Sequence, residues 1–406
     1  MHPQAIKKMK IPFGTISITA KSKSLINEAL DLNRVSSGKY VREFERKFAK
    51  LFGVKEAAAV SSGTDALILA LAVLYDFGAK RGDEVIVPAL SFAATGNAVL
   101  HAGFKPVFVD IDISTLNIDV SKIEKSITKK TKAILPVHLM GKPADMDTIN
   151  RIAKRYKLYV IEDAAEAYGS EYKGKKVGTL ADMAAFSLYI AHMITTVEGG
   201  IVLTDRSDFA EILRSLRSHG RACKCAECVL NVSSGYCPKR FKEDGRDLRF
   251  IFERIGYSCK MNEIEAAVGL GNIEIYSKIL SKRRKNLLYL LKSFERFSTY
   301  LVSIKEEPYE KIGPHAFPIV LKENVKFSRD ELVSYLEKNG IETRSLFLSM
   351  PTQCRGFKFL GYKLGDFPNA EYVGNNGLHT GLHQDINKEH IDYFIEVIDK
   401  FLSLKD

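Results

Sequence analysis

The sequence predicts an α/β fold, in which residues 1–275 form a large domain on a mostly parallel sheet and residues 276–406 form a smaller α+β domain. Amphipathic helical stretches alternate with short apolar runs through the first two thirds of the chain, as in a parallel sheet wrapped by helices. From Met261 a long helical pattern runs past Leu291, and shorter elements of both kinds follow it. The length of 406 residues also suits one large and one small domain.

Each element of the large domain follows from a local pattern. Residues 39–51 have apolar side chains at helical spacing and end at Gly53, and residues 61–64 open a second, apolar helix over 65–77. Apolar runs predict strands at 84–87, 106–109, 133–137, 159–161 and 201–203, with helices at 146–156 and after 203 to about 217. Asp163 lies at the carboxyl end of the 159–161 strand, which is where parallel sheets bind ligands.

The smaller domain is predicted from fewer signals. Residues 316–321 predict a strand, residues 329–338 a helix, and residues 389–402 a closing amphipathic helix. The stretch from 239 to 252 is basic and has little clean periodicity. Neither an internal repeat nor a low-complexity tract interrupts the pattern.

Composition narrows the class of protein. Hydrophobic residues make up 46% and charged residues 27%, near the averages of globular proteins. The first ten residues lack the apolar run of a signal peptide, and no run of about 18 apolar residues predicts a membrane span, so we expect a soluble cytoplasmic protein. The net charge of +11 suits an anionic ligand, but its densest patch, residues 278–285, is typical of a solvated helix face. No motif supports nucleic-acid binding.

Four of the six cysteines fall in one polar loop within residues 220–241: Cys223, Cys225, Cys228 and Cys237. In a cytosolic protein such a cluster indicates metal binding before a disulfide. Four thiolates are the usual requirement of a 2Fe-2S cluster, while tetrahedral zinc fits the same ligands and stays open. A loop of four unmetallated thiols is disfavoured because it would be prone to oxidation.

Several short blocks, in order along nearly the whole chain, resemble the DegT/DnrJ/StrS family of sugar aminotransferases. The blocks are residues 11–14, 44–45, 61–67, 105–110, 137–141, 162–165, 256–257, Met261 and 266–270. The resemblance implies a pyridoxal-phosphate-type protein of fold type I, usually a homodimer.

The resemblance also implies a phosphate site. Gly63 and Thr64 open a helix, where free backbone N–H groups and the helix dipole can hold the cofactor phosphate. Without the other blocks, these two residues would be an ordinary helix start. Ser187 matches a family serine that contacts the same phosphate. Ser258 departs from the pattern, because relatives carry there an asparagine that reaches the phosphate from the neighbouring subunit.

Three further residues match positions around the cofactor ring. Phe92 corresponds to an aromatic side chain that stacks on the pyridine, although a lone Phe is more often part of a core. Asp163 corresponds to the carboxylate that keeps the pyridine nitrogen protonated and so makes the ring an electron sink. Glu166 stands where many relatives carry a glutamine facing the ring hydroxyl.

Residues 186–200 resemble the family stretch Ser-x-x-x-x-Lys…Glu-Gly-Gly, with His192 in place of the lysine that holds pyridoxal phosphate covalently. No lysine lies between Lys176 and Lys224 to replace it. This substitution resembles a branch of dehydratases that use pyridoxamine phosphate and a histidine to remove the C3 hydroxyl of nucleotide-linked 4-keto-6-deoxyhexoses. In that role His192 is a general base and then the acid for the departing hydroxyl.

Two alternatives to dehydration stay open. The chain could be an inactive relative with a binding or regulatory role, or an aminotransferase whose lysine lies elsewhere. Within the dehydratase branch, residues 220–225 and 237–241 resemble a subgroup that carries an iron-sulfur cluster and accepts electrons from a reductase. That subgroup takes its fourth thiolate from beside the ring-binding aspartate, where this chain has Ala164 and Ala165, so Cys228 is the candidate replacement. With zinc or no metal, we expect hydrolysis of the dehydrated product instead of reduction.

Overall fold

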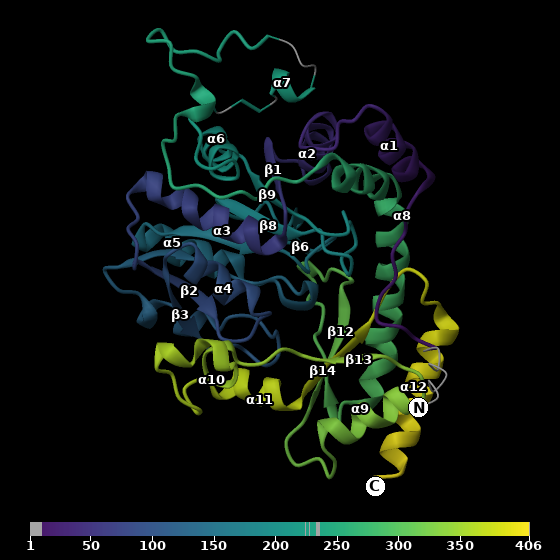
Figure 1. Ribbon diagram of the computed structural model, residues 1–406. Coiled ribbons are helices and arrows are strands. Elements are labelled where there is room, and N and C mark those ends of the chain that lie inside the picture. The colour runs from purple at the N-terminus through teal and green to yellow at the C-terminus, as the bar shows by residue number, and fades with distance from the viewer. Residues whose placement is uncertain (1–9, 224, 227, 233–235, 406) are drawn as a thin grey trace, which may run out of the picture.

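The computed structural model describes residues 10–223, 225–226, 228–232 and 236–405 (Figure 1). Its main feature is a seven-stranded sheet of order β1-β9-β8-β5-β4-β2-β3. The strands are β1 (Glu56–Val60), β2 (Glu84–Pro88), β3 (Lys105–Val109), β4 (Thr131–Ile134), β5 (Tyr159–Asp163), β8 (Met183–Ser187) and β9 (Gly200–Thr204). The five strands from β8 to β3 are parallel to one another. At the other edge, β9 pairs antiparallel with β8, and β1 pairs antiparallel with β9.

Helices cover both faces of this sheet (Figure 1). The helices of this part of the chain are α1 (Ala20–Asp31), α2 (Lys39–Phe52), α3 (Gly63–Val73), α4 (Ala94–His101) and α5 (Met146–Tyr156), with α6 (Ser207–Leu216) and α7 (Val229–Val232) after the last strand. Side chains alternate across the strands, so in β9 Val202 joins the core that includes α3 and α6, whereas Ile201 and Leu203 join the core that includes α2. Both faces are therefore buried, as a mostly parallel sheet requires.

Helix α8 (Glu263–Phe294) connects this sheet to the second region and runs without interruption through the predicted domain boundary at 275/276. It begins with a capping box, in which Asn262 and Glu265 satisfy each other's backbone N–H groups. The second region has a four-stranded sheet of order β10-β12-β14-β13. Its strands are β10 (Leu301–Val302), β12 (Ala316–Leu321), β13 (Thr343–Ser345) and β14 (Gly377–Gly381), and its helices are α9 (Arg329–Lys338), α10 (Met350–Gln353), α11 (Pro368–Asn376) and α12 (Lys388–Ser403).

Two smaller features join the regions. The strands β6 (Glu171–Tyr172), β7 (Lys175–Lys176) and β11 (Glu310–Lys311) form a small antiparallel sheet that pairs residues of both regions. At the start of the described chain, Ile11 bridges to Ile341 of the second region. Among the helices that the structure describes, none combines the length and the apolar character that a membrane crossing needs.

Candidate active site

Two predicted site residues lie at the carboxyl ends of neighbouring strands. Asp163 is the last residue of β5, and Ser187 is the last residue of β8, which pairs with β5 in parallel. The Asp163 side chain is buried, and its Oδ2 accepts a hydrogen bond of 2.8 Å from Thr95 Oγ1. Burial raises the pKa of this carboxyl, while the bond from Thr95 opposes the shift. A cationic partner such as a protonated pyridine nitrogen would compensate the buried carboxylate.

A backbone cradle faces Ser187 at the start of α3. The Ser62 side chain caps the helix by accepting a hydrogen bond of 3.0 Å from the N–H of Asp65. The N–H groups of Gly63 and Thr64 have no partner inside the helix, because they belong to its first turn. A Cβ atom on Gly63 would stand only 2.7 Å from Ser187 Cβ. Glycine is therefore required here, and the helix terminus that it opens fits a phosphate group.

Phe92 lies beside this site and leaves most of its ring uncovered. Its side chain is 63% exposed, and its ring centroid is 5.8 Å from that of Phe347, which belongs to the second region. The Phe92 carbonyl accepts a hydrogen bond from the N–H of Thr95, the residue that also bonds Asp163. An exposed aromatic ring close to a buried carboxylate fits a planar cofactor ring.

His192 lies on a tight loop between β8 and β9. Hydrogen bonds from Thr196 N to the Leu188 carbonyl and from Leu188 N to the Gly199 carbonyl close the base of this loop, each at 2.9 Å. Val197 has φ of 77°, which is strained for a β-branched residue. The loop therefore holds the His192 backbone in a defined place instead of leaving it to fluctuate.

The His192 ring lies near two other titratable side chains, His315 and Tyr168. Its Nδ1 atom is buried and has no hydrogen-bond partner among the described residues. Its ring centroid is 5.2 Å from that of His315 and 6.4 Å from that of Tyr168. Burial, and the positive charge of Arg283, lower the pKa of His192 to about 4, so its imidazole is neutral at pH 7.

Glu166 also lies beside His315. His315 Nε2 is 3.5 Å from Glu166 Oε1, and Glu166 Oε2 accepts a hydrogen bond of 2.7 Å from the N–H of Met140. Burial, and the charge of Asp163, raise the pKa of Glu166 to about 7. Burial holds the pKa of His315 well below its usual value. We name the group of His192, His315 and Glu166 the histidine pocket.

Two residues at this site were not predicted from the sequence. His315 comes from the second region, directly before β12, and Arg283 comes from α8. Arg283 is buried, and its guanidinium donates two hydrogen bonds to Gln384 Oε1, at 2.7 and 3.1 Å. No local motif marks either residue, because their relation to His192 arises only when distant segments pack together.

The structure supplies no substitute for the missing lysine in the interior. Among the residues that the structure describes, Lys142 is the one buried lysine. Its ammonium group donates to the Glu310 carboxylate and, at 2.8 Å, to the Lys305 carbonyl. Because both contacts hold Lys142 in place, it is not available to bind a cofactor covalently.

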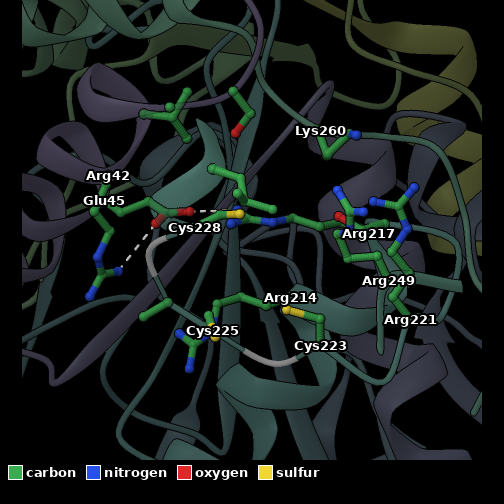
Figure 2. A pocket seen from close by; sticks show the side chains of 16 residues that line it. Arg42, Glu45, Arg214, Arg217, Arg221, Cys223, Cys225, Cys228, Arg249 and Lys260 are labelled. Atoms are coloured by element: carbon green, nitrogen blue, oxygen red, sulfur yellow. Dashed lines mark hydrogen bonds and ion pairs between the residues drawn. The ribbon is translucent and has the colours of Figure 1, made fainter. Parts of the chain in front are cut away.

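Within its described residues, the cysteine loop gives no support for the predicted metal site. Cys223, Cys225 and Cys228 line one cavity (Figure 2), and Cys237 lies close enough to affect the titration of Cys225. However, the described part of the chain contains no group of three or more His, Cys, Asp or Glu side chains arranged to hold a metal ion. All four cysteines are free. An iron-sulfur cluster or a tetrahedral zinc at these four cysteines therefore stays a prediction.

Cationic side chains dominate the lining of the same cavity. They are Arg42, Arg214, Arg217, Arg221, Arg249 and Lys260, and we name this space the basic cavity. None of the three members of the histidine pocket lines it. The two sites are therefore formed by different sets of residues.

Comparison with known proteins identifies relatives over the whole length. The model of the DegT/DnrJ/EryC1/StrS aminotransferase family matches residues 17–399. The lipopolysaccharide biosynthesis protein RfbH of Salmonella typhimurium is 34% identical over 97% of this chain and 92% of its own length. GDP-perosamine synthase of Caulobacter vibrioides is 35% identical over 97% of this chain and 98% of its own.

A solved structure is also similar to this chain over nearly its whole length. The Escherichia coli GDP-4-keto-6-deoxy-D-mannose-3-dehydratase with bound hydrated PLP superimposes with a TM-score of 0.83 at 32% identity, covering 96% of this chain and 99% of that one. The relatives thus include both a dehydratase and a synthase, so similarity alone does not choose between these reactions. The predicted fold of type I is confirmed.

Proposed function

Because the chain belongs to the DegT/DnrJ/EryC1/StrS aminotransferase family, we propose that it is a pyridoxamine-phosphate-dependent dehydratase that removes the C3 hydroxyl of a nucleotide-linked 4-keto-6-deoxyhexose. Family membership makes it an enzyme that works with pyridoxal or pyridoxamine phosphate on a sugar. The observation that supports dehydration over amine transfer is His192, which occupies the lysine position in a sequence block that otherwise matches the family. The product would serve deoxysugar and surface-polysaccharide synthesis.

The cofactor would be held by residues of three elements. Gly63 and Thr64 would bind the phosphate through their backbone N–H groups, with Ser187 opposite them. Asp163 would bind the pyridine nitrogen, and Phe92 would cover one face of the ring. When bound, pyridoxamine phosphate supplies an amine that condenses with the 4-keto group and a ring that accepts electrons.

His192 would move the protons of the reaction. Its imidazole is neutral at pH 7, so it can take the proton from the cofactor's C4′ carbon. With a pKa of about 4, the imidazolium that results is a strong acid, which suits donation of the same proton to the departing C3 hydroxyl. The hydroxyl then leaves as water.

Glu166 would contribute a protonated carboxyl group to the histidine pocket. Its raised pKa keeps the carboxyl largely protonated up to about pH 7, beside a histidine that stays unprotonated. Paired groups whose environments separate their pKa values are typical of acid and base partners. Glu166 and His315 would thus keep excess negative charge away from His192 and hold its ring in place.

The proposal stops at dehydration and does not include cluster-mediated electron transfer. The described cysteines do not form a ligand group, so reduction by a 2Fe-2S cluster and a reductase lacks structural support. Iron, zinc and sulfide analysis of anaerobically purified protein addresses this point directly. Iron and sulfide in equal amounts would restore the electron-transfer version. We also propose a homodimer, as the resemblance implies, and sedimentation velocity tests it.

The main test replaces His192. His192→Asn is expected to lower the dehydration rate by about 10²- to 10⁴-fold, the usual contribution of a general acid–base group, while the protein still binds pyridoxamine phosphate. His192→Lys is expected to lose dehydration and to gain a borohydride-reducible adduct that absorbs in the visible. Product formation from GDP-4-keto-6-deoxymannose and exchange of the C4′ hydrogen with solvent are the measurements. If the wild-type protein already contains a reducible lysine adduct, or if it neither keeps the cofactor nor exchanges that hydrogen, the proposal is wrong.

A further inference from the structure

Two buried hydroxyl groups lie behind the Asp163 carboxyl group. Thr95 is buried, and its Oγ1 donates a hydrogen bond of 2.8 Å to Asp163 Oδ2. Ser91 is also buried, and its Oγ lies 2.8 Å from the same Thr95 Oγ1. Ser91, Thr95 and Asp163 therefore form one continuous chain of hydrogen bonds, and we name its two hydroxyl residues, Ser91 and Thr95, the hydroxyl chain.

The direction of the hydrogen bonds in the hydroxyl chain follows from the number of protons. A hydroxyl group has one proton to donate, and Thr95 donates it to Asp163. The contact between Ser91 and Thr95 is then a hydrogen bond in which Ser91 donates and Thr95 accepts. Because both protons are directed toward the carboxyl group, the hydroxyl chain favours the ionised form of Asp163.

Other groups near Asp163 support its ionised form less strongly than Thr95 does. Burial raises the pKa of Asp163, and the hydrogen bond from Thr95 is the largest effect that opposes this rise. The N–H of Ala165 donates to Asp163 Oδ1 at 3.3 Å, which is longer than the bond from Thr95. His138 lies nearby, but its Nδ1 accepts from the N–H of Ala144 and its Nε2 lies 3.1 Å from Glu162 Oε2. Thr95 is therefore the main partner of this buried carboxyl group within the described ranges.

The segment that carries the hydroxyl chain also carries Phe92. The N–H of Thr95 donates to the Phe92 carbonyl at 3.1 Å, and Thr95 lies in the first turn of α4. One short segment between β2 and α4 thus provides both the exposed aromatic ring and the hydroxyl that bonds Asp163. The bonds made by Thr95 connect Phe92 to Asp163, the two residues that would contact the cofactor ring.

We propose that Thr95, supported by Ser91, is a positioning residue that keeps the Asp163 carboxylate ionised and oriented to hold a protonated pyridine nitrogen. This role rests on the proposed function, because it takes Asp163 as the partner of that nitrogen. A carboxylate has about four lone-pair sites, so the bonds from Thr95 and Ala165 leave room for a further donor. Without the Thr95 hydroxyl, the buried carboxyl group more readily keeps a proton, and a neutral carboxyl group cannot balance a pyridinium.

Cofactor affinity tests this role without relying on catalysis. Apoprotein is titrated calorimetrically at pH 7 with pyridoxamine phosphate and with its 1-deaza analogue, in which a carbon atom replaces the pyridine nitrogen. Thr95→Val keeps the shape of the side chain and removes the hydroxyl. It is expected to weaken binding of pyridoxamine phosphate about tenfold or more, since a hydrogen bond to a charged group is worth at least that factor. The analogue cannot use Asp163, so its affinity should be the same in wild type and variant.

Two further measurements separate positioning from a structural role. Thr95→Ser keeps the hydroxyl and should restore most of the affinity for pyridoxamine phosphate. With the cofactor labelled with ¹⁵N in its ring, the NMR shift of the bound nitrogen should indicate a protonated pyridine in wild type. In Thr95→Val the shift should move toward that of the neutral pyridine, because the carboxyl group competes for the proton.

Thr204→Val is the matched control. Thr204 is also buried, and its Oγ1 donates a hydrogen bond of 2.8 Å to the Asp182 carbonyl. It lies at the end of β9 opposite to Gly200, which pairs with Ser187, so its substitution should leave both affinities unchanged.

The outcomes distinguish this role from the proposed reaction. Wild-type affinity for pyridoxamine phosphate in Thr95→Val, equal weakening of both ligands, or the same selective loss in Thr204→Val would overturn the role of Thr95. A selective loss in Thr95→Val alone would support that role, even if wild type failed to dehydrate its substrate and the proposed reaction were wrong. Absence of cofactor binding to wild type would overturn both.

Discussion

The histidine pocket and the basic cavity both contain titratable side chains, but they differ in whether those side chains carry charge. In the histidine pocket, burial removes charge: His192 and His315 have lowered pKa values, and Glu166 has a raised one. In the basic cavity, cationic side chains gather, and ion pairs such as Arg217 with Glu45 hold some of them. The first arrangement suits groups that must exchange protons, and the second suits groups that must attract an anion.

Because of this difference in charge, substitutions in the two regions are expected to affect different properties of the protein. Removing a neutral histidine leaves no unpaired charge behind, so it should affect chemistry more than stability. Removing one partner of a buried ion pair leaves the other charge uncompensated, so it should affect stability more than chemistry. The two regions can therefore be distinguished by measuring both quantities on the same variants.

The largest expected effect on stability is at Arg217. The Arg217 guanidinium pairs with Glu45, whose side chain is 1% exposed, and donates to the Ala59 carbonyl at 2.7 Å. Arg217→Met is expected to lower the free energy of unfolding by about 3–5 kcal/mol, because Glu45 would keep only its pair with Arg42. Urea unfolding measures the loss. Arg155→Met, which breaks the exposed pair with Glu124, should change stability little, and equal losses in both variants would contradict the comparison.

A smaller effect, on catalysis, is expected at His315. Its ring centroid is 5.2 Å from that of His192, and its Nε2 is 3.5 Å from Glu166 Oε1, so we expect it to position the His192 imidazole by contact. His315→Gln is expected to lower kcat by about 10- to 100-fold with a small change in KM, since displacing a reacting group by about 1 Å has consequences of this size. His315→Asn, which keeps a polar group of smaller reach, should recover part of the loss. An unchanged kcat, or a change confined to KM, would show that His315 does not position His192.

The sequence predicted the parts of the molecule whose signals are local. The strand that ends at Asp163 was marked by an apolar run and the charges that follow it, and the cradle at Gly63 by residues that cap a helix. Strands β1 and β8 were not predicted. Both are rich in alanine, which has a weak preference for strands, so their position depends on pairing with β9.

The pocket itself could be predicted only in part. His192 was marked by the block around it, but His315 lies more than a hundred residues later and reaches the pocket through the packing of the second region. The cysteine spacing suggested a metal site, but spacing does not determine where side chains point, and the described residues contain no group of three or more ligands arranged to hold a metal. The basic cavity has no sequence signal either, because its six cations, drawn from residues 42 to 260, meet only in the fold.

The smallest expected effect is a change in the pH dependence of stability at Glu166. Burial raises its pKa from 4.5 to about 7, so between these values the folded protein keeps the carboxyl protonated while the unfolded chain ionises it. The folded state then binds more protons, and the contribution of Glu166 to stability, full below pH 4.5, is lost as the pH rises toward 7. Glu166→Gln is expected to remove this decline, which has a slope of at most about 1.4 kcal/mol per pH unit. Urea unfolding of cofactor-free protein at pH 5, 6 and 7 measures it, with Glu211→Gln on the exposed side of α6 as the control. If wild type and Glu166→Gln show parallel pH profiles, Glu166 ionises as freely as an exposed carboxyl, and the histidine pocket does not differ from the basic cavity in excluding charge.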